Sequence, residues 1–161
     1  MSISLLFFIA SYCGRREEPE IKNQIISYLI SQSLTSTGSP CQNFSLSEAA
    51  CIVAPELSST TCSSSEISRL KLIIEPTSLR TDEVLDKFFV CWKNCNLIFN
   101  VQETICMKDK FATNKAYREA QRSGTTSSST NWGICMNRCN KGEDTESGLN
   151  KTGASYPKSA Y

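Results

Sequence analysis

The chain has 161 residues and contains no histidine. Without an imidazole it has no Ser-His-Asp or Cys-His nucleophile activation, no His-ligated zinc and no histidine pH switch near neutrality. It also has no glycine-rich phosphate loop and no nucleophile elbow. Its 17 basic and 16 acidic residues leave a formal net charge of +1, which gives no electrostatic signature of nucleic-acid binding. We therefore expect no enzymatic activity, no cofactor, no metal ion and no nucleic-acid partner.

The apolar run at residues 3–10 is too short to span a membrane, which takes about 20 apolar residues. Its length suits the core of a secretory signal peptide, and cleavage after Cys13 would place the small residues Ser11 and Cys13 at the recognised positions. A bacterial lipoprotein would carry lipid on Cys13, but the bulky Tyr12 argues against that. A first buried segment of the fold is the other alternative. We predict that residues 1–13 are a signal peptide, with no membrane insertion after its removal.

The cysteine count also favours a secreted protein. The chain has nine cysteines, and removing Cys13 leaves eight, an even number that predicts a disulfide framework in a small secreted protein. N-glycosylation sequons at Asn43 and Asn150 fit the secretory route. We therefore expect a secreted, extracellular protein whose disulfides are formed by Cys41, Cys51, Cys62, Cys91, Cys95, Cys106, Cys135 and Cys139.

Hydrophobic periodicity is helical throughout, and no stretch alternates long enough for a strand. The predicted fold class is all-α, a compact disulfide-stapled bundle of about five to six helices. We expect residues 14–139 to form this helical domain and the polar residues 140–161 to be a mostly irregular tail.

The first predicted helix begins at Pro19, and a turn-rich linker follows at residues 33–40. Ser45 and Glu48 have the spacing of a capping box, which predicts a second helix that runs to about Pro55.

The same box at Ser63 to Glu66 predicts a third helix that Pro76 closes. Thr81 is the expected N-cap of the fourth helix, which has acidic residues in its first turn and an apolar stripe beyond it. A fifth helix is predicted over 103–122. A Ser/Thr-rich linker over 125–130 and a short helical turn at 132–139 are expected to follow it.

Cys91 and Cys95 are four residues apart on the fourth predicted helix, so they share one face. A pair in that position is badly placed to bond to itself, and we expect each sulfur to be tied to a neighbouring element. Two unpaired buried thiols are an alternative. A four-thiolate zinc site that adds Cys135 and Cys139 is another, although zinc sites usually use tighter spacings in loops.

The spacing of four cysteines resembles that of the insect odorant-binding protein family. There are 28 residues between Cys62 and Cys91, three between Cys91 and Cys95, and 43 between Cys95 and Cys139. The segment 81–95 resembles the charged-then-aromatic approach to the family's paired cysteines.

The segment 134–144 resembles the family's sequence around its fourth cysteine, so the resemblance covers residues 62–146. The chain departs from the family because no fifth or sixth cysteine follows Cys139, and extra cysteines lie upstream.

This resemblance implies a helical carrier in olfaction that transports a small hydrophobic, odorant- or pheromone-like molecule in an apolar cavity, with a membrane receptor as a further partner. It implies a Cys62–Cys95 bond and leaves the partners of Cys91 and Cys139 open. The residues expected to line the cavity, or alternatively to fill a dry core, are Ile67, Leu70, Ile74, Leu85, Phe88, Trp92, Phe99, Phe111 and Tyr117.

A second resemblance is to the twin Cys-x-x-x-Cys proteins of the mitochondrial intermembrane space. It implies two antiparallel helices joined by Cys91–Cys139 and Cys95–Cys135 bonds, with a structural or protein-interaction role. The 39 residues between the two motifs make a longer connection than that family's hairpin. A secreted effector is a third possibility.

Overall fold

The computed structural model describes residues 38–98, 110–123 and 127–157. Within these ranges the protein is helical, with two isolated β-bridges and no strand, which confirms the all-α prediction. The α-helices are α2 (Pro40–Ala49), α3 (Ser58–Thr61), α4 (Ser64–Lys71), α5 (Asp82–Asn96), α7 (Asn114–Ser123) and α8 (Ser127–Asn140), and the 3-10 helices are η1 (Thr77–Leu79) and η3 (Leu149–Lys151). The helix predicted from Pro19 lies outside the described residues. None of the described helices is long and apolar enough to cross a membrane.

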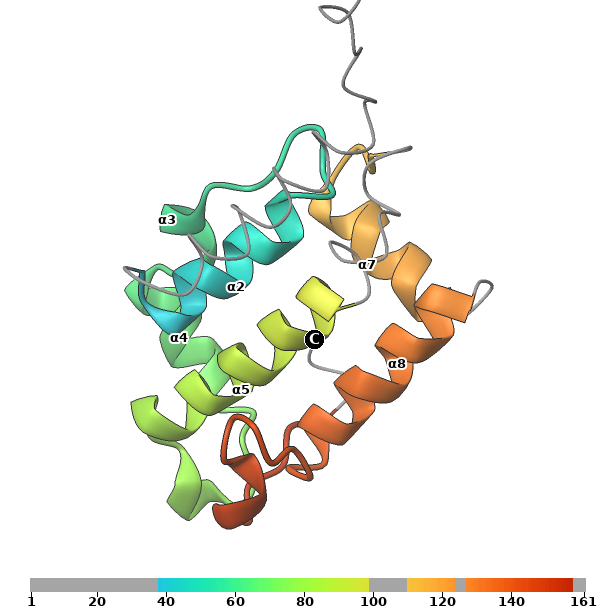
Figure 1. Ribbon diagram of the computed structural model, residues 1–161. Helices are drawn as coiled ribbons and strands as arrows, with labels where there is room; N and C mark the ends of the chain where they lie inside the picture. Colours follow the sequence, from blue (N-terminus) through green and yellow to red (C-terminus); the bar gives the residue numbers. More distant parts are fainter. Residues whose placement is uncertain (1–37, 99–109, 124–126, 158–161) are drawn as a thin grey trace, which may run out of the picture.

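Helix α5 is the central element, with α2 on one side and α8 on the other (Figure 1). It begins as predicted, because the Thr81 hydroxyl accepts a hydrogen bond from the Val84 amide at 3.2 Å. Asp82 and Glu83 then place negative charge at the positive end of the helix dipole.

The buried face of α5 carries the aromatic core. Phe88 and Trp92 are fully buried, and Phe44 of α2 packs on Trp92 with ring centroids 5.9 Å apart. Phe89 completes the contact between the two helices, 5.7 Å from Phe44. Buried apolar side chains of this size supply most of the free energy that favours folding.

Helix α2 begins earlier than predicted. Its N-cap is Ser39, whose hydroxyl accepts from the Gln42 amide while the Gln42 side chain accepts from the Ser39 amide, a complete capping box. The prediction that Ser45 starts this helix is wrong, because Ser45 is buried in its middle. Pro40, assigned to a linker, is the first helical residue, where its missing N–H leaves no bond unmade.

Helix α4 has the predicted cap, since Ser63 accepts from the Glu66 amide. It ends at Lys71, not at Pro76 as predicted, and residues 72–74 turn so that Ile74 is fully buried. Helix α3 precedes it as a single turn.

Helices α7 and α8 also differ from the prediction. Helix α7 begins only at Asn114, because Phe111 pairs its backbone with the segment after α2, donating to Cys51 and accepting from Val53 at 2.8 Å each. Helix α8 starts at Ser127, so much of the Ser/Thr-rich run predicted to be a linker is helical. Residues 103–109 of the predicted fifth helix lie outside the described residues.

Residues 141–157 have little regular structure but cover one end of the core. Tyr156 is 1% exposed, and its ring lies 4.8 Å from Trp92 in an edge-on contact. Ser155 and Glu75 exchange two backbone hydrogen bonds, which fix this segment beside the turn after α4. Leu149 and Ala154 are buried in the same cluster.

Gly142 sets the direction in which the chain leaves α8. Its φ is +71°, and the amides of Gly142 and Glu143 donate to the carbonyls of Cys139 and Arg138, the pattern of a Schellman cap. A Cβ at this position would overlap with the carbonyl oxygen of Ala154. The turn therefore requires glycine.

We predict that Gly142→Ala lowers the free energy of unfolding by about 2 kcal/mol or more, because it adds both backbone strain and the clash with Ala154. Gly133→Ala is the matched control, since Gly133 lies inside α8 with nothing near a new Cβ. The control should raise the stability by about 0.5–1 kcal/mol. Urea unfolding of the oxidised variants measures both changes, and equal effects of the two substitutions would contradict the prediction.

Candidate functional site

Two disulfides join α5 to α8 and form a ladder. Cys91 bonds to Cys139 and Cys95 bonds to Cys135, with Cα–Cα distances of 5.8 and 5.7 Å. Since the earlier cysteine of α5 pairs with the later cysteine of α8, the two helices are antiparallel (Figure 1). The expectation that each sulfur of the α5 pair is tied to a neighbouring element is confirmed.

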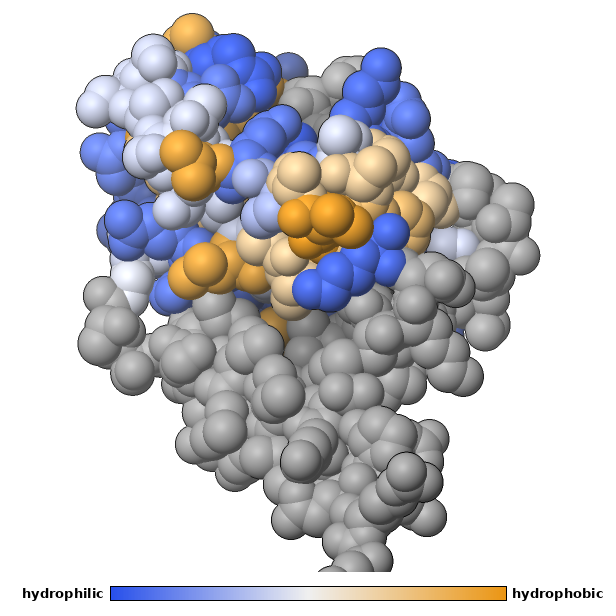
Figure 2. Space-filling model, turned by 90° about the horizontal axis from the view of Figure 1, so that it is seen from above, coloured by the Kyte–Doolittle hydropathy of each residue, from blue (hydrophilic) through white to orange (hydrophobic). Residues whose placement is uncertain are grey.

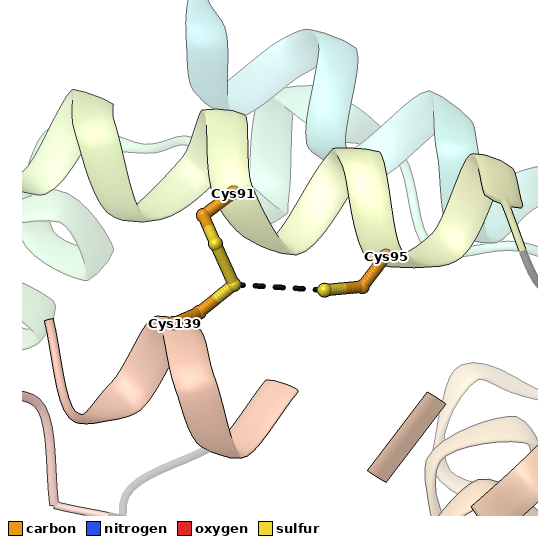
Figure 3. Close-up of side chains that lie close together, drawn as sticks. All are labelled: Cys91, Cys95 and Cys139. Carbon is orange, nitrogen blue, oxygen red and sulfur yellow. Dashed lines mark hydrogen bonds between the residues drawn. A yellow bond between two sulfur atoms is a disulfide. The ribbon is translucent and has the colours of Figure 1, made fainter. Parts of the chain in front are cut away.

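The sulfur atoms of the ladder form one compact cluster. The Sγ atoms of Cys95 and Cys139, which belong to different disulfides, are 3.5 Å apart, and Figure 3 shows both pointing into the space between the helices. The sulfurs of Cys91, Cys95 and Cys139 all lie within 4.8 Å of one another. These three residues are at most 2% exposed.

The third bond corrects the pairing that the odorant-binding resemblance implied. Cys62 bonds to Cys41, so the implied Cys62–Cys95 bond is not formed. The bond pins α2 to the turn that ends α3. Cys51 is disulfide-bonded as well, and Cys106 lies outside the described residues.

Asn96 is the centre of a buried polar network that joins four helices. Its Oδ1 accepts from the Tyr117 hydroxyl at 2.9 Å and from the Trp132 indole N–H at 2.8 Å. Its Nδ2 donates to the Ser47 hydroxyl at 3.0 Å. Burial, together with the negative charge of Glu48, raises the pKa of Tyr117 well above its usual range, so Tyr117 stays a neutral donor.

Glu48 forms an ion pair that connects α2 to α7. Its fully buried carboxylate accepts two hydrogen bonds from the Arg118 guanidinium, at 3.0 and 2.7 Å, and a third from the Asn114 side chain at 3.2 Å. A carboxylate out of water needs such partners, because its desolvation costs several kcal/mol. The sequence pattern gives no sign of this pair, because it assigns Glu48 to a capping box.

The predicted ligand-lining residues lie mostly in packed clusters. The main core contains five of them: Leu70, Ile74, Leu85, Phe88 and Trp92. Ile67 is partly buried and packs against this core. Phe111 and Tyr117 pack on each other in a second cluster with Cys51 and Ile52. Phe99 lies outside the described residues.

A cavity of about 310 Å³ opens between α2, α3, α4, α5 and α7. Two ion pairs border it, because Arg69 is held bidentately by Glu66 and Arg118 by Glu48. Of the predicted ligand-lining residues that the structure describes, only Leu70 and Trp92 reach it. Its apolar wall consists of these two with Phe44 and Phe89.

Tyr156 carries the one buried side-chain oxygen without a hydrogen-bond partner in the part of the chain that the structure describes. Burial raises the pKa of Tyr156 to about 12. Its role here is the ring contact with Trp92, since a phenol that donates to nothing adds only its aromatic surface to the core.

Exposed apolar side chains lie in and just before the connection from α2 to α3. Val53 and Leu57 of this connection are 69% and 72% exposed, and Leu46 of α2 is 48% exposed. The connection lies toward the upper edge of Figure 1, and the view from that side in Figure 2 shows hydrophobic side chains in the middle of the face, with hydrophilic ones along part of their border. We call these three residues the α2–α3 apolar patch.

The two sequons differ in accessibility. Asn150 is exposed in η3. Asn43 is half-buried within α2, and its side-chain amide donates to the Gly38 carbonyl at 3.0 Å.

Comparisons of the chain with protein-family models, with curated proteins and with solved structures found no match. The function is therefore inferred from the geometry of the disulfides, the cavity and the surface.

We predict that Glu48→Gln lowers the free energy of unfolding by about 2–3 kcal/mol, because it leaves the partly buried Arg118 guanidinium without its counter-charge. Glu83→Gln is the matched control, since the Glu83–Lys87 pair is on the surface and screened by water. The control should lower the stability much less, because it removes only an exposed ion pair and one of the two acidic charges in the first turn of α5. Urea unfolding of both variants tests this, and a Glu48→Gln protein as stable as the control would contradict it.

A peptide map of the non-reduced protein by mass spectrometry should give the linked pairs Cys41–Cys62, Cys91–Cys139 and Cys95–Cys135. Recovery of a Cys62–Cys95 peptide would overturn the ladder.

Proposed function

We propose that this protein is non-enzymatic and acts by binding another protein, with the disulfide ladder holding its helices as a rigid frame. The observation that carries the proposal is the pairing of Cys91 with Cys139 and of Cys95 with Cys135. That pairing is the one implied by the resemblance to twin Cys-x-x-x-Cys proteins. Two covalent ties between antiparallel helices fix their distance and register, which suits a binding surface that must not deform.

The proposed location is outside the cell, in an oxidising environment. Structural disulfides persist in secreted proteins and are rare in the reducing cytosol. Three disulfides within the described residues, together with a bonded Cys51, support this location.

The proposed contact surface is the α2–α3 apolar patch. Val53 and Leu57 are 69% and 72% exposed. Contact of large apolar side chains with water is unfavourable, so a partner that covers them gains free energy of binding. The Cys41–Cys62 bond and the backbone pairing with Phe111 hold both ends of the connection in place. Binding there would therefore cost little conformational entropy.

A second candidate is the carriage of a small hydrophobic molecule. One observation favours it, the cavity of about 310 Å³ with an aromatic wall that includes Phe44, Phe89 and Trp92. The charged residues at its border, Glu66 and Arg69 among them, suit this function less well, because an apolar ligand would have to displace their water.

Native mass spectrometry of the full protein, purified from its own source without denaturant, distinguishes the two candidate functions. We expect a complex with another protein, and cross-links from that protein to residues near the α2–α3 apolar patch. The double variant Val53→Asp, Leu57→Asp should lose the complex at unchanged stability. Leu72→Asp is the matched control, because Leu72 is 63% exposed outside the patch, after α4, and its substitution should leave the complex intact.

A stoichiometric small molecule bound to the isolated chain would overturn the protein-binding proposal. The cavity would then be its site if Leu70→Arg abolished the small-molecule adduct while the α2–α3 patch variants kept it.

A further inference from the structure

We infer that a groove between α7 and α8 binds the C-terminal end of another polypeptide, with the terminal carboxylate at Arg122 and the last apolar side chain beside Gly133. The groove is a cavity of about 410 Å³, and none of the residues of the α2–α3 apolar patch lines it. The inference rests on the protein-binding function proposed above and adds a second contact of defined chemistry to it.

The charge of the groove favours an anion. Arg122 lines it, and no acidic residue does so among those that the structure describes. The Arg122 guanidinium forms no ion pair within the described ranges, since Glu119, one turn earlier in α7, is paired with Lys115 at 3.8 Å. An unpaired cation in an otherwise neutral groove is complementary to a negatively charged ligand.

The start of α8 adds to this preference. Only residues 124–126 separate α7 from α8, which are joined at the right of Figure 1. Ser129 and Thr130, at the start of α8, line the groove together with Arg122. The first turn of α8 has no acidic residue, and the amino-terminal end of a helix carries a partial positive charge. This end of the groove is therefore where a carboxylate is best stabilised.

The opposite end presents a buried hydrogen-bond donor. Asn140 is 7% exposed, and its Oδ1 accepts the indole N–H of Trp92 at 2.9 Å. Because an indole nitrogen can only donate, this bond fixes the orientation of the amide and leaves Nδ2 for the groove, which Asn140 lines. Nδ2 donates to no atom of the described residues. A ligand with a carbonyl oxygen would supply the missing acceptor.

The middle of the groove is apolar. Trp132 and Met136 line it and are nearly buried, whereas Ile134 is 58% exposed. Gly133 also lines the groove, and nothing lies within 4 Å of the position that its Cβ would take. An apolar side chain of the ligand therefore has both open space and an apolar surface to cover.

A polypeptide end combines these three features, since it has one carboxylate, backbone carbonyl oxygens and an apolar last side chain. Capture of a C-terminal carboxylate is a recurring mode of peptide recognition. The groove follows α8 from its start to Asn140, about 15 Å at 1.5 Å per residue. An extended peptide covers that length with about five residues.

The test is an NMR titration of the full oxidised protein, labelled with ¹⁵N, with four acetylated pentapeptides of the sequence Gly-Ser-Gly-Ser-X. X is valine, leucine, isoleucine or phenylalanine, and each peptide is used as the free acid and as the C-terminal amide. We expect saturable shifts of the Arg122, Thr130 and Gly133 amides with at least one acid. Its C-terminal amide should bind about tenfold more weakly or worse, because it lacks the charge that Arg122 pairs with.

Variants then assign the parts of the groove. Arg122→Gln should weaken binding of the acid about tenfold and leave binding of the C-terminal amide unchanged. Gly133→Leu should abolish binding of both, since the new side chain fills the groove while leucine favours the helix more than glycine does. Arg138→Gln is the matched control, because Arg138 is an exposed arginine of α8 that lines a different cavity, and it should bind as the wild type does.

The inference is overturned by the absence of saturable shifts with all four acids up to about 2 mM, by equal affinities for acid and amide, or by an Arg122→Gln protein that binds as the wild type does. Equal affinities for N-acetyl-leucine and the leucine pentapeptide would also overturn it, since the groove would then be a site for small organic acids. The proposed function itself fails only if the native complex is absent, so the two failures are distinguishable.

Discussion

The covalent connection between α5 and α8 is the constraint on which the rest of the structure depends. A single bond such as Cys91–Cys139, with its partners 48 residues apart, removes chain entropy from the unfolded state worth about 4 kcal/mol in the simplest model. The second bond closes a loop that the first has already shortened, so its entropic contribution is smaller. Its main effect is to fix the rotation of the two helices about each other. That register sets which faces of α5 remain for α2 and for the segment that carries Tyr156.

The buried polar groups then specify how the remaining helices pack on this pair. Apolar contacts such as Phe44 on Trp92 tolerate small slips, because they have little directionality. The hydrogen bonds of Asn96 do not tolerate such slips, since a shift of one helix would leave buried donors and acceptors unpaired. The Glu48–Arg118 pair has the same role between α2 and α7. The core is thus held by disulfides between α5 and α8 and by directional polar contacts among α2, α5, α7 and α8.

Sequence reasoning predicts the features that depend on local pattern, and it fails for those that depend on contacts between distant segments. The N-cap and the apolar stripe of helix α5 predict it from the sequence, and the structure has both. Eight cysteines allow 105 pairings, so no spacing rule alone selects the ladder. Ser39 and Ser45 offer similar caps, and only the packing of α2 chooses between them. Asn96 lies four residues after Trp92 on the buried stripe, a polar residue in an apolar register, which is a signal that could have exposed the network. Tyr156 gives none, because its segment has no period.

The way in which the interior is filled bears on where recognition takes place. A carrier must separate its helices enough to admit a ligand, and in this protein that movement would have to pull Trp92 away from the rings of Phe44 and Tyr156 and from the Asn140 side chain that accepts its indole N–H. The ladder opposes the same movement on the α8 side of α5. Breathing of the core is therefore costly, whereas the exposed Val53 and Leu57 need no rearrangement to meet a partner. A frame closed in this way favours binding on its outside.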